Sequence, residues 1–164
     1  MPRGSCRGDM PKGDMTEPDP NARRRRWMAV LARASAAEIE ALLEATELPP
    51  PHIRLRGPEI GLVMVRGRAG GGGAGFNLGE MTVARCSVRN EEGRVGHAYV
   101  AGRDLRHAEL AAALDAAMQD EARRDALEAA IVVPLAAAQA RARAANEGKA
   151  AATRVQFFTM ANMR

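Results

Sequence analysis

Residues 51–101 contain strand-like runs joined by short turns, and helix-like sequence lies on both sides of this block. Gly70–Gly75 indicates a flexible turn, and Asn90–Gly93 indicates a four-residue hairpin loop. Successive short turns favour an antiparallel meander, so the pattern predicts an α+β fold with helices before and after the sheet. The expected strands are Pro51–Arg56, Gly61–Arg68, Phe76–Arg89 with a bend near Gly79, and Arg94–Ala101.

The first helical segment begins at Asn21, a residue type that suits an N-cap. Ser35 and Glu38 have the spacing of a capping box, which predicts a second short helix after a break. Residues 1–21 are polar and hold four of the nine prolines, which predicts a disordered leader. Residues 22–164 are then expected to form a single domain.

The C-terminal part predicts further helices that cover one face of the sheet. Asp104 is the expected N-cap of a helix that runs to about Asp125. Residues 131–133 are β-branched and precede Pro134, which predicts an extended link. A second helix is expected over 135–145, and an extended tail after it.

Composition limits the class of protein. The chain has 164 residues, of which 46% are hydrophobic and 27% charged, and this is typical of a soluble globular domain. It has no apolar run long enough for a membrane span, and its polar N-terminus has no signal-peptide core. Cys6 and Cys86 cannot form a disulfide framework, so we expect a reducing compartment, the cytoplasm.

Two short sequence clusters suggest anion binding. The glycine tract could cradle a phosphate, but it lacks the Lys-Ser/Thr and the helix of a P-loop, so a flexible connection is the competing interpretation. In the second cluster, Arg103, Asp104 and His107 surround a helix start. They could hold an anion or nucleotide there, or they could simply cap the helix and form local ion pairs.

Arginines alternate with apolar residues on the expected strands. Arg85 and Arg89 share one face, whereas Cys86 lies on the apolar face and is expected to be inert packing. The arginine face is either solvated or an interface for a protein or polyanion. The basic run at 23–26 could contact nucleic acid, although it could equally solvate a helix start. We found no set of catalytic residues and no metal-ligand set.

The chain resembles the G-subunit family of the bacterial carbon–phosphorus lyase core complex. The resemblance lies in four blocks from about Arg25 to Met160. These are Trp27-Met28-x-Val30-Leu31-Ala32; Glu59-x-Gly61-Leu62-Val63; Gly79-Glu80-x-Thr82-x-x-Arg85 with Val88-Arg89 and Gly102-Arg103-Asp104-x-x-His107-Ala108-Glu109; and Pro134-Leu135 with Arg154-Val155-x-Phe157-Phe158-Thr159-Met160.

The resemblance implies an essential subunit without a catalytic residue of its own, in organophosphonate catabolism. The expected reaction of the complex transfers the ribose 5-triphosphate of ATP onto a phosphonate and releases adenine. The expected partners are subunits called H, I, J and K, with I the most direct, and the family resemblance implies two copies in the core. This chain is expected to bind no cofactor alone. The complex uses MgATP, and radical-SAM iron–sulfur chemistry belongs to another subunit.

The expected partner contacts combine both kinds of reasoning. Trp27, Phe157, Phe158 and Met160 are the candidate interface anchors, because large apolar side chains dominate interface energetics. Arg85 and the residues of the second cluster are candidate anion or partner contacts. Neither nucleic acid nor a membrane is an expected partner. The competing hypotheses are a nucleotide- or nucleic-acid-binding module, and an enzyme that uses His107 as an acid or base.

Overall fold

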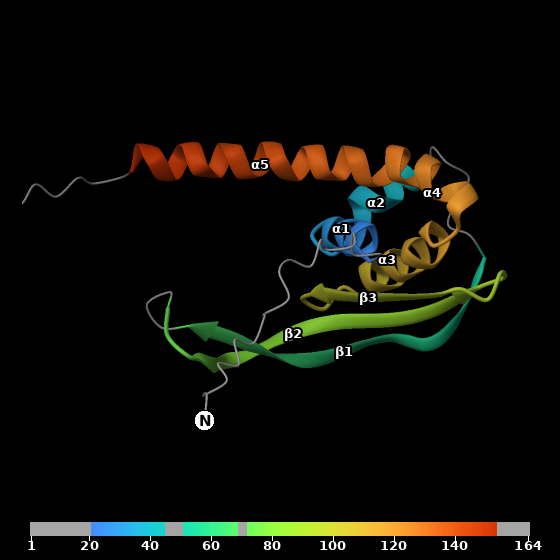
Figure 1. The fold of residues 1–164 in the computed structure, drawn as a ribbon, viewed down its shortest axis with the longest axis horizontal. Helices are drawn as coiled ribbons and strands as arrows, with labels where there is room; N and C mark the ends of the chain where they lie inside the picture. The colour runs from blue at the N-terminus through green and yellow to red at the C-terminus, as the bar shows by residue number, and fades with distance from the viewer. Residues whose placement is uncertain (1–20, 45–50, 69–71, 154–164) are drawn as a thin grey trace, which may run out of the picture.

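A computed structural model describes residues 21–44, 51–68 and 72–153. Its helices lie on one side of a three-stranded antiparallel sheet, so the α+β class is confirmed (Figure 1). The helix α3 packs directly against the sheet, and α5 is the outermost helix (Figure 1). The elements are α1 (Ala22–Leu31), α2 (Ala36–Leu43), β1 (His52–Arg68), β2 (Gly75–Asn90), β3 (Val95–Ala101), α3 (Leu105–Met118), α4 (Glu121–Leu127), the π-helical turn η1 (Glu128–Val132) and α5 (Val133–Ala152).

The helix starts follow the local sequence closely. The Ser35 hydroxyl accepts a hydrogen bond from the Glu38 N–H, and the Glu38 carboxylate accepts one from the Ser35 N–H, so the capping box is confirmed. Asp104 caps α3 as expected. Asn21 precedes α1 as expected, but it acts through its backbone carbonyl, which accepts from the Arg25 N–H at 2.8 Å, and not through a side-chain cap.

The sheet is a meander in the order β1-β2-β3. The two separate strands expected before the glycine turn were wrong, because they form the single long strand β1. Its register shifts on either side of Arg56, so that Arg56 pairs with Ser87 and Glu59 with Arg85. A bulge there removes Pro58 from the ladder, where its missing N–H could not donate.

The alternation on β2 is confirmed. Ala84, Cys86 and Val88 face the helices and are buried, whereas Arg85 and Arg89 lie on the opposite face. Apolar residues of β3 and of the alanine-rich helix α3 complete this core. The sheet is therefore covered by helices on one face only, which leaves its other face and the ends of its strands as surface.

Two expectations for the C-terminal helices were wrong. The helix from Asp104 ends at Met118 and not near Asp125, because Asp120 adopts an extended backbone and accepts the Ala122 N–H at 3.1 Å, which starts α4. The residues before Pro134 are also not extended. They form η1, which continues into α5 with the proline in its first turn.

The π-helical turn explains how a proline sits inside a continuous helical path. Proline lacks an N–H and its ring collides with the carbonyl four residues earlier, and a wider turn relieves this collision. Ile131 and Val132 are buried in the core within this turn, so helical geometry here is favoured by packing. The outcome shows that tertiary burial outweighs the local preference of a β-branched run.

Gly96 marks the closest approach of β3 to α3. A Cβ atom at this position would lie 2.0 Å from the Ala112 carbonyl oxygen and 2.5 Å from the Ala116 nitrogen. We expect Gly96→Ala to lower the free energy of unfolding by about 3 kcal/mol or more, because backbone cannot move aside as a flexible side chain can. Urea denaturation of the chain fused to a solubilising protein measures this.

Gly79→Ala is the matched control, because it changes a glycine in the same sheet whose Cβ would meet nothing within 4 Å. It should change the unfolding free energy by less than about 1 kcal/mol. Equal effects of the two substitutions would contradict the close packing of β3 on α3.

Candidate interaction surface

The cluster at the start of α3 does not converge on an anion site. The Asp104 carboxylate accepts the His107 backbone N–H at 2.9 Å, which is a helix cap. The His107 ring points into the core, where its Nε2–H donates to the Leu31 carbonyl at 2.8 Å and joins α3 to α1. Arg103 lies on the surface. The arrangement therefore favours the capped-helix interpretation over a binding or acid–base site.

Glu109 lies on α3, five residues after Asp104, and binds the first strand. Arg54 donates to its two carboxylate oxygens at 2.7 and 2.8 Å, and His52 lies 3.3 Å from one of them. The Arg54 hydrogen bonds lower the pKa of Glu109 below its ordinary value, and His52 adds to the effect. This bidentate pair fixes β1 against α3, and both oxygens of the Glu109 carboxylate are engaged by Arg54.

A fully buried carboxylate, Asp115, was missed by the sequence reasoning. It accepts four hydrogen bonds, two from Arg24 at 3.0 and 2.7 Å, one from Trp27 Nε1 at 2.9 Å and one from the His97 N–H at 3.0 Å. The signal was present, because an acidic residue stands within the Ala-Leu run of α3. Its partners come from α1 and β3, so its role is to tie three elements together.

Trp27 therefore does not occupy the place we expected. Its side chain is buried in the core of this chain and bonded to Asp115, and it is not available as a surface anchor. Helical spacing alone does not distinguish an apolar residue that faces the chain's own core from one that faces a partner. Phe157, Phe158 and Met160 lie outside the described residues.

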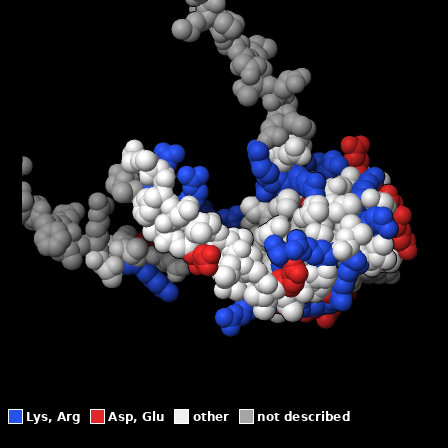
Figure 2. All heavy atoms as spheres, turned by 90° about the horizontal axis from the view of Figure 1, so that it is seen from below, with Lys and Arg blue, Asp and Glu red and all other residues white. Residues whose placement is uncertain are grey.

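Ion pairs join some of the charged side chains on the outer face of the sheet. Arg85 donates to Glu59 at 2.7 Å, and Arg56 pairs with the same carboxylate. These contacts, led by the Arg85 hydrogen bond, lower the pKa of Glu59. On the face that Figure 2 shows, acidic side chains lie among the basic ones. The arrangement is that of a mixed surface and not of a continuous basic track for a polyanion.

The run of arginines at the start of α1 is also engaged in ion pairs. Arg23 binds Asp125 and Glu128, and Arg24 binds Asp115. Two of its four arginines thus connect α1 to other helices of the chain. These contacts favour the structural interpretation of the run over nucleic-acid contact.

The strands β1 and β2 extend beyond the end of β3 and form an arm, which we define as residues 61–68 and 75–82. β3 pairs only with Val83–Arg89, so the arm is a two-stranded ribbon (Figure 1). The arm carries large apolar side chains whose exposed fractions are 42–66%. They are Leu62, Met64, Phe76, Leu78 and Met81. A two-stranded ribbon with apolar side chains in water is marginal on its own, so this surface is suited to a partner.

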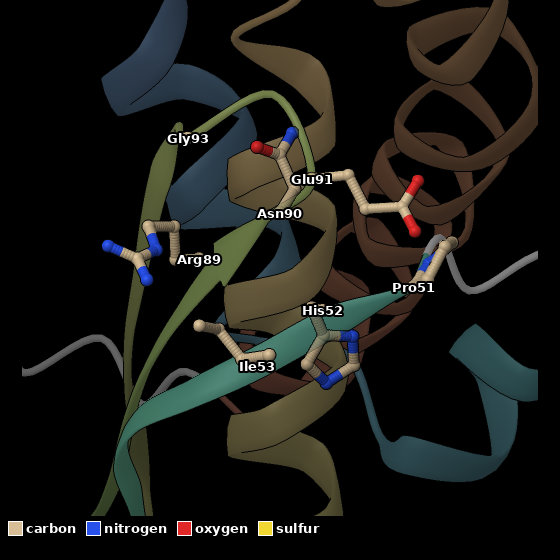
Figure 3. Close-up of a pocket in the computed structure, with 7 residues that line it drawn as sticks. All are labelled: Pro51, His52, Ile53, Arg89, Asn90, Glu91 and Gly93. Carbon is tan, nitrogen blue, oxygen red and sulfur yellow. The ribbon is translucent and has the colours of Figure 1, made fainter.

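An open hollow of about 490 Å³ lies where β1 begins, beside the hairpin turn between β2 and β3. Figure 3 shows Arg89 and Glu91 at its wall, with side chains that point away from each other. Within residues 21–44, 51–68 and 72–153, no group of three or more His, Cys, Asp or Glu could hold a metal ion. The Cys86 thiol is buried, and burial raises its pKa, which opposes nucleophilic reactivity.

No helix in the part of the chain that the structure describes is long and apolar enough to cross a membrane.

Comparisons with known proteins agree with the family resemblance. A family model described as "Phosphonate metabolism protein PhnG" matches residues 22–162. A relative from Rhizobium meliloti (strain 1021), the alpha-D-ribose 1-methylphosphonate 5-triphosphate synthase subunit PhnG, is 48% identical over 139 residues. The alignment covers 85% of this chain and 88% of the relative.

The Asp115 cluster makes a prediction about stability. We expect Asp115→Ala to lower the free energy of unfolding by about 3–5 kcal/mol, because it leaves the Arg24 guanidinium and two N–H donors without their acceptor. The control is Asp125→Ala, which removes a surface carboxylate that also binds an arginine of α1 and should cost less than about 1 kcal/mol. Comparable losses in urea denaturation would contradict the central role of Asp115.

The Glu109 pair makes a prediction about pH. A carboxyl group whose pKa is lowered by folding stabilises the fold above its unfolded value, and that contribution is lost as pH falls through the folded value. Glu109→Gln should therefore cost about 1–2 kcal/mol near pH 7, and the difference from wild type should shrink below about pH 4.

Glu40→Gln is the control, because Glu40 also binds an arginine but is exposed at 42%. Its effect should stay below about 0.5 kcal/mol at both pH values. A Glu109→Gln deficit that is the same at pH 7 as at a pH well below 4 would show that the pair does not stabilise through its charge.

Proposed function

The chain belongs to the PhnG family of phosphonate metabolism proteins, and from this premise we propose that it is a non-catalytic but essential subunit of alpha-D-ribose 1-methylphosphonate 5-triphosphate synthase. The enzyme's proposed reaction breaks the bond between adenine and the ribose of ATP. A phosphonate oxygen takes the place of adenine at that carbon, and the triphosphate stays on the ribose. The MgATP and the phosphonate bind to the assembled enzyme, and this chain supplies surface and support.

The hydrogen bonds of the candidate acid–base groups favour a non-catalytic role for this chain. His107 donates to a backbone carbonyl, Glu109 is held by Arg54, and Asp115 is saturated by four donors. Each group connects elements of this chain. A group whose hydrogen bonds are already taken up by the fold is poorly placed to transfer a proton during a reaction. The charged residues of the chain therefore account for its fold, and the enzyme hypothesis based on His107 loses its main support.

The observation that carries the proposal is the apolar arm. Several charged side chains of the body, among them Arg24, Arg54 and Arg85, form ion pairs within the chain. The large apolar side chains of the arm, in contrast, remain in water. Covering them with a companion subunit would gain roughly 25 cal/mol for each Å² of apolar surface removed from water. A chain of this design is stable and soluble in its complex and prone to aggregate without it.

The proposed companions are the subunits called H, I, J and K, with I in the most direct contact. The C-terminal residues Phe157, Phe158 and Met160 are proposed as a second anchor, because aromatic side chains are frequent hot spots of interfaces. The nucleotide- or nucleic-acid-binding alternative is disfavoured by the internal ion pairs of Arg23, Arg24 and Arg85.

Co-expression with the companion subunits tests the proposal. We expect the chain alone to be poorly soluble and the H, I and J subunits together with it to give a soluble complex on size exclusion. The double variant Leu62→Glu/Met64→Glu should reduce the recovered complex at least about tenfold, since charges would be buried in the interface without partners. Recovered complex is quantified by affinity capture of a tagged I subunit.

The control is Val133→Glu, which places a charge at a large exposed apolar residue on the helical side of the molecule. It should leave the yield of complex within about twofold of wild type. A wild-type chain that stays monomeric and never associates with the I subunit would overturn the proposed function.

A further inference from the structure

The edge strand β3 has a side that faces away from β2. In an antiparallel pair, successive residues direct their backbone N–H and C=O groups alternately toward the partner strand and away from it. The Gly102 N–H bonds to the Thr82 carbonyl at 2.9 Å, and the Asn90 N–H bonds to the Arg94 carbonyl at 3.1 Å. The even-numbered residues therefore face β2, and the odd-numbered residues of β3 direct their backbone groups to the open side.

The first half of this open side is closed by a side chain of α3 and by Gln119, the residue that follows the helix. The Asp115 carboxylate accepts the His97 N–H at 3.0 Å, and the Gln119 amide donates to the Val95 carbonyl at 2.7 Å. Both contacts satisfy backbone groups that a neighbouring strand would otherwise bind. A strand added along β3 would therefore start beyond His97.

The second half of the open side has no such cover. In the described ranges, no hydrogen bond reaches the Tyr99 N–H or C=O on this side of the strand. Tyr99 is also 54% exposed. The outward N–H and C=O of one residue are the groups to which a neighbouring strand, antiparallel or parallel, forms its hydrogen bonds.

An apolar groove lies directly beside these unpaired groups. It has a volume of about 220 Å³ and runs between α1 and β3, with α1 on the helix side of the sheet (Figure 1). The residues that make it apolar are Met28, Leu31, Ala32, Ala98, Val100 and Ala111. A groove between a helix and an open strand edge is the geometry in which extended peptides add a strand.

We propose that an extended segment of a companion subunit adds a fourth strand to β3 at Tyr99. This inference rests on the proposed function and specifies one of its contacts. The segment's backbone would bind the Tyr99 N–H and C=O, and one neighbouring side chain would enter the groove beside Ala98 and Val100. The volume and apolar lining of the groove suit a side chain of the size of leucine or phenylalanine.

The groove favours a companion segment over a second copy of this chain. The helix α1 forms one wall of the groove, so the space holds a single strand. A second copy would present its own β3 already bordered by its own α1, and the two helices would meet on the same face of the joined sheet. A segment without a helix beside it avoids this collision.

Tyr99→Pro tests the backbone contact in the complex. Proline removes the outward N–H but spares the ladder with β2, because Tyr99 does not donate to that strand. The control Tyr99→Ala removes the side chain and keeps the N–H. We expect Tyr99→Pro to reduce the recovered complex with H, I and J at least about tenfold, and Tyr99→Ala to stay within about threefold of wild type. Equal yields from the two variants would overturn the inference.

Residue-resolved hydrogen exchange of the wild-type complex provides a test that requires no variant to fold. The Val100 amide, bonded to β2, is the protected reference, and the Glu92 amide in the hairpin turn is the exposed reference. We expect the Tyr99 amide to exchange within about tenfold of Val100. Exchange as fast as that of Glu92 in an intact complex would reject the added strand and leave the proposed function standing.

A measurement on the chain without its companions, kept soluble by a solubilising fusion, tests whether a companion segment or a second copy pairs with β3. We expect the chain to be monomeric and its Tyr99 amide to exchange as fast as that of Glu92. A dimer in which Tyr99 is protected would assign the edge to a second copy and overturn the choice of a companion segment. Failure of the wild-type chain to enter any complex would instead reject the proposed function.

Discussion

The contact between α3 and β3 is the constraint on which the rest of the structure depends. Gly96 lets the helix backbone lie directly against the strand, because any side chain there would overlap with Ala112 and Ala116. Asp115 then extends from the same helix to the strand and to α1. With these contacts formed, α1 and the sheet are held in one geometry. The small side chains of α3 are thus a requirement of packing and do not simply reflect an alanine-rich composition.

The same contact divides the sheet into a supported part and an unsupported part. Where β3 and α3 are present, one face of the sheet is buried, and Arg54 and Arg85 of its strands are held by carboxylates. Beyond Thr82 neither element continues, and β1 and β2 project as the arm with Leu62 and Leu78 in water. A fold that needed only to stabilise itself would have ended these strands at the edge of α3. Under the proposed function, the projection serves assembly with companion subunits.

Local rules predicted the parts of the fold that local interactions determine. The Ser35 capping box, the Asp104 cap and the alternation along β2 each depend on residues a few positions apart, and each was confirmed. The predictions for the end of α3 and for the path through Pro134 were wrong. The end of α3 depends on a local cap at Asp120 that was missed, and the path through Pro134 depends on burial against distant elements. Asp120 starts a new helix, and the buried Ile131 holds helical geometry in a segment with a strand-like pattern.

The candidate site was predictable to a similar degree. The sequence correctly separated the arginine face of β2 from its apolar face. It could not show that Arg85 and Arg24 bind acids far away in the chain, or that Trp27 faces inward. It also could not locate the open edge at Tyr99, because that edge exists only once α3 has closed the neighbouring half of the strand.

The central claim is that the apolar arm is covered in the working enzyme. Hydroxyl-radical footprinting measures this directly, because Met64 and Met81 lie on the arm and methionine sulfur oxidises readily when exposed. The account expects both residues to oxidise at least about fivefold more slowly in the assembled synthase than in the isolated fusion protein. Oxidation rates that are the same in the two states would contradict it.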